Sequence, residues 1–471
     1  VFQIESRAQM SMLPRLRPRS FYDLVIEVAI VRPGPIQGNM VHPYLRRRCG
    51  LEPVTYPSEG LRQVLHKTLG VPLFQEQAMK VAMVAAGFSA DEADQLRRAM
   101  AAWRRSGAIQ GFHQKIIDGM LKNGYDREFA ENTFMQIQGF GEYGFPESHS
   151  ASFALLVYVS AWLKCHHPAV FCAALLNSQP MGFYAPAQIV RDAKEHGVEV
   201  RCVDVNESEW DCTLEDRHEG TEARRHEVGV EPAVRLGLRQ IKGLRELMAR
   251  RIVDVRESLG AFGSIDQFHQ CTQLPRRVVQ QLTEADAFSS MNLSRRQALW
   301  QAMELSDYDS PLFSCITPSC LRASVPSCLP PMPLGQEVMT DYSTTSLSLK
   351  AHPLSLVRQT LSQQKILTAR DANNLTHGRW VKVAGLVLIR QRPGTASGIV
   401  FITLEDETGV VNLIVRPDIF DRYGAAARHA ALIQCEGHIE RQGQVVHVMA
   451  KRLFDRGELI RGYELYSRDF H

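Results

Sequence analysis

Two groups of side chains in the first third of the sequence could bind a phosphate group. Arg97 and Arg98 are neighbours in the segment LRRAM, and Arg32 begins the rigid turn RPGP. Further on, Ser148 and His149 precede an apolar segment with helical spacing. Arginine binds phosphate oxygens through paired hydrogen bonds, and the N-terminus of a helix attracts anions. The five residues are therefore candidates for a triphosphate site. Two alternatives stay open, because adjacent arginines are common on solvated helix faces and Ser148 would also serve as a helix N-cap.

Basic residues of a second group lie at two predicted hairpins between helices. The segment LRQIKGL, residues 238–244, fits a helix-hairpin-helix motif, and a degenerate second copy runs from Phe262 to Phe288. Backbone N–H groups at such a turn can meet a DNA phosphate at the start of the second helix. The tandem pattern therefore predicts binding to the DNA backbone, with two ordinary helical hairpins as the alternative. The candidate residues are Arg239, Lys242, Gly243, Arg245, Arg276 and Arg277.

Five β-rich runs beyond residue 380 predict a small OB-type barrel. They cover residues 381–389, 400–405, 410–415, 431–440 and 444–450, with a helical piece over 418–428 between the third and the fourth. Arg390 and Arg392 would attract phosphates, and Phe401 and Phe420 would stack on the bases of a single strand. The alternative for the two phenylalanines is a place in the barrel core.

The rest of the sequence supplies the elements that would position these residues. Apolar residues recur at helical spacing over 61–69, 76–86, 90–103, 109–123, 127–139 and 150–166. Short helical pieces follow over 236–303, and residues 306–339 are rich in Ser, Pro and Cys, which is typical of a linker. We therefore predict a multidomain α+β protein. Its parts are a mostly helical region over 1–230, a tandem helix-hairpin-helix module over 231–305, a linker over 306–377, an OB-type β-barrel over 378–456 and a tail over 457–471.

Composition excludes several classes of protein. The chain has 471 residues, of which 45% are hydrophobic and 22% charged, so it is neither disordered throughout nor fibrous. Its apolar runs are shorter than the roughly 20 residues of a membrane span. Ten scattered cysteines favour a reducing cytoplasm over a disulfide scaffold. The sequence contains no Gly-rich Walker loop, nucleophile elbow or zinc-binding HExxH motif. Because it starts at Val1 rather than Met, we expect a partial chain.

Several segments occur in the order found in C-family bacterial DNA polymerases, the relatives of the polymerase III alpha subunit. Those that resemble the fingers domain are VFQIES (1–6), RPGP (32–35), LFQEQ (73–77), LRRAM (96–100) and the stretch from YGF to SHS (143–150). Others resemble the error-prone, damage-inducible paralogue more than the replicative enzyme, and they are LSLKAHP (347–353), VLIRQRPGTA (387–396) and TLEDETG (403–409). The resemblance runs from Val1 to about Arg452 and is interrupted by the linker.

The resemblance implies template-directed addition of deoxynucleotides to a primer 3′ end, with translesion synthesis rather than the main replication as its purpose. The helical region 1–230 would be the fingers, where Arg97 and Arg98 contact the incoming triphosphate beside Ser148 and His149. The hairpins would hold the duplex and the barrel would approach the template strand. The implied partners are primer–template DNA, deoxynucleoside triphosphates, a sliding clamp and other proteins of a mutagenesis complex. SPLF, residues 310–313, is a faint candidate for a clamp-binding peptide.

The carboxylates of the family's palm domain have no counterpart in this sequence. Polymerases hold two metal ions with such groups. The nearest spacings here are Asp204 with Asn206, Asp307 with Asp309, and residues 405–407, and all of them fall elsewhere in the family order. We therefore assign no catalytic or metal-binding residue, and we expect Mg²⁺ only in the complete enzyme. The chain should bind DNA and nucleotide without polymerising alone. The alternative is a non-enzymatic DNA-binding accessory or scaffold protein derived from such a polymerase.

Overall fold

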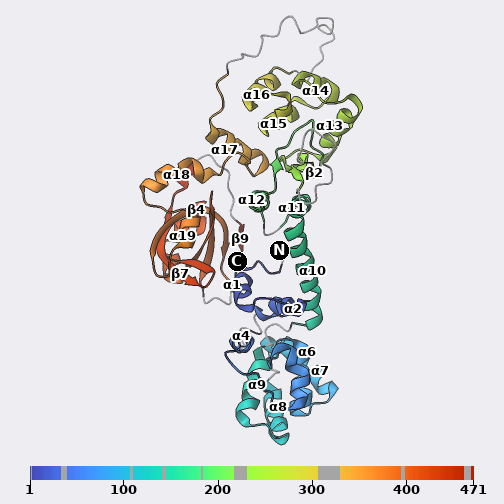
Figure 1. Ribbon diagram of the computed structural model, residues 1–471, viewed down its shortest axis with the longest axis vertical. Coiled ribbons are helices and arrows are strands. Elements are labelled where there is room, and N and C mark those ends of the chain that lie inside the picture. The colour runs from blue at the N-terminus through green and yellow to red at the C-terminus, as the bar shows by residue number, and fades with distance from the viewer. Residues whose placement is uncertain are drawn as a thin grey trace, which may run out of the picture. The chain divides into compact units, whose positions relative to one another are not determined.

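The computed structural model describes most of the chain as two compact units. The described residues are 1, 3–32, 35, 40–106, 110–139, 145–181, 184–216, 231–305, 329–393, 398–460 and 468–470. The two units are Val1–Cys165 and His166–His471 (Figure 1). Within the described ranges, no helix is long and apolar enough to cross a membrane.

The first unit is helical, as the apolar spacing predicts. Ser58 caps α5 by accepting a hydrogen bond from the backbone N–H of Leu61, and Gly87 ends α6 at a φ of +74°. Buried side chains such as Ile26, Phe74 and Ile117 share one core. The helices are α1 (Arg7–Leu16), α2 (Phe21–Ile30), α4 (Val41–Arg48), α5 (Glu59–Leu65), the 3-10 turn η1 (His66–Thr68), α6 (Gln75–Ala86), α7 (Ala90–Ser106), α8 (Gln110–Lys122), α9 (Arg127–Gly139) and α10 (Glu147–His166).

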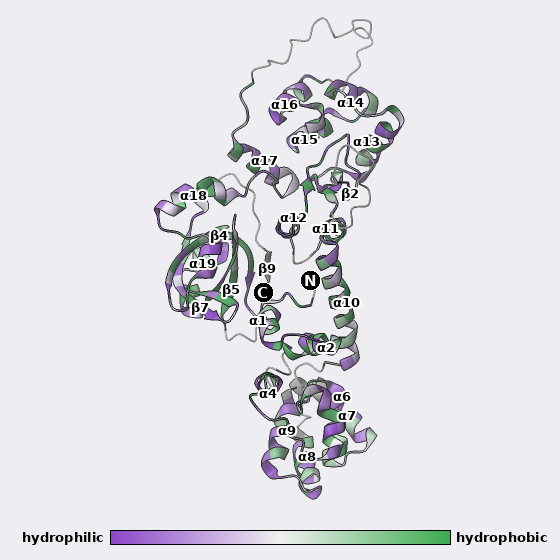
Figure 2. Cartoon of the chain, in the orientation of Figure 1, coloured by the Kyte–Doolittle hydropathy of each residue, from purple (hydrophilic) through white to green (hydrophobic). Residues whose placement is uncertain are grey.

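Five large apolar side chains of α10, a helix with many apolar residues (Figure 2), are exposed to solvent. We call this set the α10 apolar face. Soluble proteins seldom leave so many neighbouring large apolar side chains in water, and such patches mark surfaces that another chain or segment covers. The side chains are Leu155, Leu156, Tyr158, Val159 and Trp162, each between 46% and 56% exposed.

The second unit begins with helices and a small sheet. Its three strands lie in the order β1-β3-β2, with β1 parallel and β2 antiparallel to β3. The elements are α11 (Pro168–Asn177), α12 (Pro186–Glu195), β1 (Val200–Arg201), β2 (Thr213–Glu215), β3 (Ala233–Arg235), η3 (Leu238–Gln240), α13 (Glu246–Leu259), α14 (Ile265–Thr272), α15 (Arg276–Glu284), η4 (Ser289–Met291), α16 (Arg295–Glu304) and α17 (Leu334–Thr345).

One core joins residues that the sequence analysis places in three different regions. Leu176 of α11 and Leu347, which follows α17, belong to the same buried cluster as Phe268 of α14. α17 is also held by charge, because the buried Arg295 donates hydrogen bonds to the Asp341 side chain and to the carbonyl oxygen of Glu337. Helical spacing identifies a helix but does not identify the core that the helix joins. From the sequence alone, α11 therefore falls with the preceding helices and α17 with the linker.

The last part of the second unit is a closed barrel. The sheet order is β5-β6-β8-β7-β4-β9, and an additional pairing of β5 with β4 closes it around a core that includes Ile402, Leu413 and Cys435. The predicted strands, the helical piece and the multidomain α+β class are confirmed. The elements are α18 (Pro353–Gln363), α19 (Ala369–Asn374), β4 (Trp380–Gln391), β5 (Val400–Asp406), β6 (Gly409–Val415), α20 (Pro417–Arg422), α21 (Gly424–His429), β7 (Leu432–Gln442), β8 (Val445–Asp455), η6 (Gly457–Ile460) and β9 (Arg468–Phe470).

Candidate nucleotide and nucleic-acid sites

A pocket of about 640 Å³ lies among α6, α7 and the start of α10. It brings together Arg97 and Ser148, which are 51 positions apart in the sequence and which the sequence analysis assigned to one triphosphate site. Lys80 of α6 adds a second cation to its wall, and Met79 and Met83 add apolar surface. We call this the Arg97 pocket. The same wall carries the carboxylates of Glu76, Asp94 and Glu147, so an anionic ligand would have to compete with them for the two cations.

The two adjacent arginines share one carboxylate. Asp94 Oδ1 accepts hydrogen bonds from Arg97 Nε at 2.9 Å and Nη2 at 2.8 Å, and Asp94 Oδ2 lies 2.8 Å from Arg98 Nη2. The hydrogen bond from Arg97 lowers the pKa of the Asp94 carboxyl, so Asp94 is ionised at neutral pH. The side chains of Arg97 and Arg98 are 43% and 75% exposed. A phosphate would therefore compete with Asp94 for Arg97 rather than meet a free cation.

Carboxylates surround the start of α10. Tyr22 Oη donates a 2.6 Å hydrogen bond to Glu147 Oε1, and the Glu147 backbone N–H donates to Glu76 Oε2 at 3.0 Å. Burial, and then the bond to Glu147, raises the pKa of the Tyr22 hydroxyl. Glu76 therefore occupies one of the N–H groups with which this helix start would bind an anion.

Arg32 and His149 meet at a different point, the ring of Phe145. The Arg32 guanidinium lies 4.9 Å from the ring centroid, and the His149 ring packs edge-on with a centroid distance of 5.1 Å. Arg32 Nη2 also donates to Gln3 Oε1 at 2.9 Å. The five predicted nucleotide residues thus form two neighbouring sets linked by the consecutive residues Ser148 and His149, both of which are exposed.

Sequence reasoning missed Lys80, Glu147 and Tyr22. A signal for Lys80 was present, because Glu76 lies in the LFQEQ motif and a residue four positions later faces the same side of a helix. The contact of Tyr22 with Glu147 joins residues 125 positions apart, and no local pattern could reveal it.

The first hairpin has the predicted tight turn. Some of its basic side chains donate hydrogen bonds within the protein, and another is exposed before a helix. Gly243 has a φ of +79°, which favours glycine. Lys242 is engaged within the protein, since its Nζ donates to the carbonyl oxygen of Tyr342 at 2.9 Å. Arg239 donates to Asp211 Oδ1 at 2.5 Å and to the carbonyl oxygen of Asn177 at 2.7 Å. Arg245, the residue directly before α13, is exposed.

In the second hairpin and the barrel, too, some predicted arginines donate hydrogen bonds within the protein and others are exposed. Arg276 donates to the carbonyl oxygen of Met303, whereas Arg277 is exposed in the first turn of α15. Arg390 is only 7% exposed and donates to the carbonyl oxygens of Ala427, at 3.0 Å, and Ala430. It therefore fastens the end of α21 to the barrel and does not face a ligand, in contrast to our expectation from the sequence.

Two exposed arginines of the barrel lie over one ring. The guanidinium groups of Arg392 and Arg428 lie 5.9 Å and 5.1 Å from the ring centroid of Phe420. Phe420 is partly buried against the barrel core. Arg245, Arg277 and Arg392 are thus the predicted DNA-binding arginines that are exposed.

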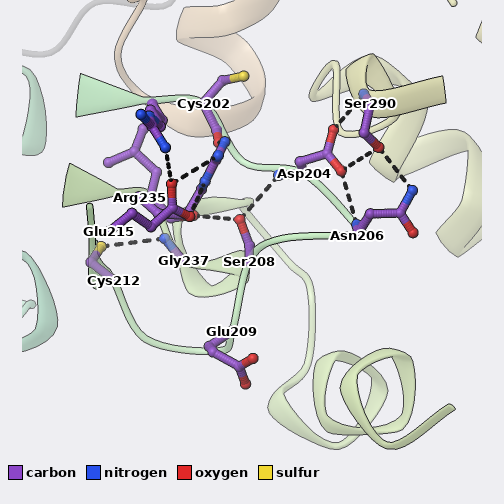
Figure 3. Close-up of polar contacts among 12 residues, drawn as sticks. Cys202, Asp204, Asn206, Ser208, Glu209, Cys212, Glu215, Arg235, Gly237 and Ser290 are labelled. Atoms are coloured by element: carbon purple, nitrogen blue, oxygen red, sulfur yellow. Dashed lines mark hydrogen bonds and ion pairs between the residues drawn. The ribbon is translucent and has the colours of Figure 1, made fainter. Parts of the chain in front are cut away.

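The acidic spacings that could suggest a metal site have structural roles. Asp204 is 1% exposed and accepts hydrogen bonds from Ser290 N and Oγ at 2.8 Å and 2.7 Å (Figure 3). Asp406 is equally buried and accepts from the Ala369 N–H at 2.7 Å. Asp307 and Asp309 lie outside the described residues. Across the part of the chain that the structure describes, no group of three or more His, Cys, Asp or Glu could hold a metal ion. These residues do not fit a two-metal site.

Three family models match successive parts of the chain. They are described as the bacterial DNA polymerase III alpha subunit finger domain, over residues 1–124, a helix-hairpin-helix motif, over 197–298, and an OB-fold nucleic acid binding domain, over 370–455. The fold and these matches make the chain similar to the class of bacterial DNA polymerase III alpha subunits, with two further modules similar to a helix-hairpin-helix and to a nucleic-acid-binding OB-fold.

Curated relatives narrow this class. The chain is 55% identical to error-prone DNA polymerase 2 of Agrobacterium fabrum and 54% identical to the error-prone DNA polymerase of Sinorhizobium medicae, over 96% and 97% of its length. It is 52% identical over its whole length to the error-prone DNA polymerase of Alkalilimnicola ehrlichii. The chain is therefore a homologue of the bacterial error-prone DNA polymerases, as the motifs predict. It spans 42% to 44% of the length of these relatives.

Proposed function

We propose that this chain is the nucleotide- and DNA-binding part of an error-prone DNA polymerase that acts in translesion synthesis and damage-induced mutagenesis, and not in the main replication. The observation that carries the proposal is the Arg97 pocket, where a cation and a hydroxyl from separate helices line one cavity. Its substrates are primer–template DNA and deoxynucleoside triphosphates. Bacterial polymerases work in the cytoplasm, and we place the complete protein there.

In this proposal the incoming triphosphate displaces Asp94 from Arg97. Arg97 Nε and Nη2, which now both donate to Asp94 Oδ1, would donate to the phosphate oxygens instead. Ser148 would donate its hydroxyl to the phosphates, and Lys80 would balance their charge. Until the ligand arrives, Asp94 stays paired with Arg97.

The metal chemistry belongs to another part of the complete protein. Two Mg²⁺ ions would activate the primer 3′ hydroxyl and stabilise the leaving pyrophosphate. Because the described residues do not fit such a site, we derive no metal-dependent step from them. The candidate clamp-binding peptide, residues 310–313, lies outside the described residues, and a sliding clamp and other mutagenesis proteins remain proposed partners.

The α10 apolar face supports the view that the chain works within a larger protein. Its five large side chains are about half exposed in this chain. The relatives are more than twice as long as the part that this chain matches. We propose that the remaining portion of such a polymerase covers this face, because burial of apolar surface is the main source of stability in such contacts.

Substitution of Arg97 tests the nucleotide site. We expect Arg97→Ala to weaken binding of a fluorescent deoxyadenosine triphosphate to this chain about tenfold, because a charge-assisted hydrogen bond to phosphate contributes about 1.5 kcal/mol or more. Arg62→Ala is the matched control, since Arg62 is also partly exposed and paired with a carboxylate three positions earlier, Glu59, at 3.3 Å. Equal affinity of the Arg97→Ala variant and the unaltered chain would show that the pocket does not hold the triphosphate.

The exposed hairpin arginines should bind duplex DNA through its backbone. Replacing Arg245 and Arg277 together by alanine should weaken binding to every sequence alike. The logarithm of the association constant falls with the logarithm of the salt concentration, and each phosphate contact contributes about 0.9 to the steepness of this fall. The double variant should therefore show a slope that is shallower by about two. Arg250→Ala is the control, since Glu246 neutralises Arg250 at 2.6 Å. Fluorescence anisotropy between 50 and 200 mM salt measures both effects, and an unchanged slope in the double variant would contradict the assignment.

A further inference from the structure

The outer surface of the barrel has one basic and aromatic face, on β4, β7 and β8. Adjacent strands pair Trp380 with His438, Lys382 with Glu436, and Glu436 with Arg452. The residues between them, such as Val381 and Cys435, point into the barrel core. Successive residues of a strand alternate between faces. The residues that lie together on the outside are therefore Trp380, Lys382, Glu436, His438 and Arg452. We call this set the Trp380 face.

Its aromatic and cationic groups are held in place yet remain accessible. The Trp380 ring is 46% exposed and lies nearly perpendicular to the His438 ring, at a centroid distance of 4.8 Å. Glu436 lies 3.1 Å from Lys382 Nζ and 3.6 Å from Arg452 Nη1. Glu436 is almost buried, but the side chains of Lys382 and Arg452 are 40% and 61% exposed. One carboxylate thus fixes two cations that can still meet a ligand.

Neighbouring residues make the face more basic. The pairing of β7 with β8 shifts register between Glu436 and Gly437, and this bulge exposes Lys451 next to Arg452. A Cβ atom on Gly437 would lie 2.2 Å from the carbonyl oxygen of Met449, so the bulge requires glycine there. Arg379, directly before Trp380, is exposed as well. Lys382, Arg452, Lys451 and Arg379 thus give this part of the barrel four cations, while β7 adds the carboxylates of Glu436 and, two residues past His438, of Glu440.

The opposite strands have a different character. OB-folds usually bind oligonucleotides on their second and third strands, which are β5 and β6 here. The outward residues of these two strands include no lysine or arginine, and the one charged group, Glu405, is paired with Arg191. α18 covers the far half of the β4–β7 surface through Leu354 and Leu361, which pack with Leu386 (Figure 1). The Trp380 face is the half that stays open.

We propose that single-stranded nucleic acid binds on the Trp380 face, with one base stacked on the Trp380 ring and adjacent phosphates paired with Lys382 and Arg452. An exposed ring beside ordered cations is the arrangement that binds single strands without regard to sequence. The inference rests on the proposed function only in that the chain works on DNA. It places the strand on a surface that neither the OB-fold match nor the sequence analysis assigns.

Binding of a fluorescein-labelled twelve-residue oligothymidylate to the full chain tests this site. We expect Trp380→Ala to weaken binding about tenfold and Trp380→Phe to retain most of it, because base stacking on an aromatic ring contributes about tenfold in affinity or more. Trp300→Ala is the matched control, since Trp300 of α16 is also 46% exposed. The double variant Lys382→Gln, Arg452→Gln, which keeps the tryptophan, should lower the salt slope by about 1.4, at about 0.7 for each phosphate of a single strand.

The outcomes separate this inference from the proposed function. Unchanged oligothymidylate binding in both the Trp380→Ala and the double variant would overturn the inference and would indicate a protein contact at this face. Duplex binding that still depends on Arg245 and Arg277 would then leave the proposed function intact. If the Trp380→Ala chain loses single-strand binding while its duplex binding and thermal unfolding stay unchanged, the Trp380 face is confirmed.

Discussion

Replacing Glu27 by glutamine is expected to raise the free energy of unfolding of the first unit by about 3 to 5 kcal/mol at pH 8.5 and to change it little at pH 4. Glu27 lies in α2 with a fully buried side chain. Neither carboxyl oxygen has a hydrogen-bond partner among the described residues. Burial without a partner disfavours the charged form and raises the pKa of Glu27 to about 8.

The direction of the pH dependence follows from this raised pKa. Below about pH 4.5 the carboxyl is protonated in both the folded and the unfolded chain, and it adds no pH dependence to the stability. Between pH 4.5 and pH 8 only the folded chain keeps the proton, so unfolding releases it and stability falls as the pH rises. Glutamine has the same shape and no charge, and the variant should therefore lose this part of the pH dependence.

Urea unfolding at a series of pH values, followed by tryptophan fluorescence, measures the effect. Trp162 of α10 reports on the first unit. The control is Glu59→Gln, because Glu59 is a largely exposed glutamate of α5. If the Glu27→Gln variant and the unaltered chain show parallel stability curves from pH 4 to pH 8.5, Glu27 is paired or solvated and this account of α2 fails.

Local sequence patterns predicted the secondary structure and the fold class because these depend on neighbours in the chain. Period-3.6 spacing located α5 to α10, and turn residues located the five strands of the barrel. The structure exposes Ser148 and His149 at the start of α10 and brings Arg97 and Ser148 to one pocket, and their role in nucleotide binding stays a prediction.

Side-chain roles that depend on distant carbonyl groups could not be predicted. Arg390 looks like a DNA contact in the sequence, but its hydrogen bonds go to the carbonyl groups of Ala427 and Ala430, 37 and 40 positions away. Arg239 is occupied in the same way by residues 28 to 62 positions away. The pairing of Asp94 with Arg97 is different, because a spacing of three on a helix is visible in the sequence.

We propose that this chain binds the substrates and that the groups which join them belong to another part of the polymerase. We expect the largest effect in primer extension. A complete polymerase should extend the primer, and the isolated chain should add no nucleotide. Binding of DNA and nucleotide alone positions substrates, but without metal-holding carboxylates it leaves the 3′ hydroxyl unactivated. The described residues provide no such group of carboxylates.

The decisive measurement is extension of a labelled primer–template by the isolated chain with Mg²⁺ and all four deoxynucleoside triphosphates. The Arg97→Ala chain, purified in parallel, identifies any activity from a contaminating polymerase, because such activity would not depend on Arg97. We expect the isolated chain to add no nucleotide to the primer, and to show measurable binding of duplex DNA and of nucleotide. Extension by the unaltered chain that Arg97→Ala abolishes would contradict it, since the catalytic groups would then lie within these 471 residues.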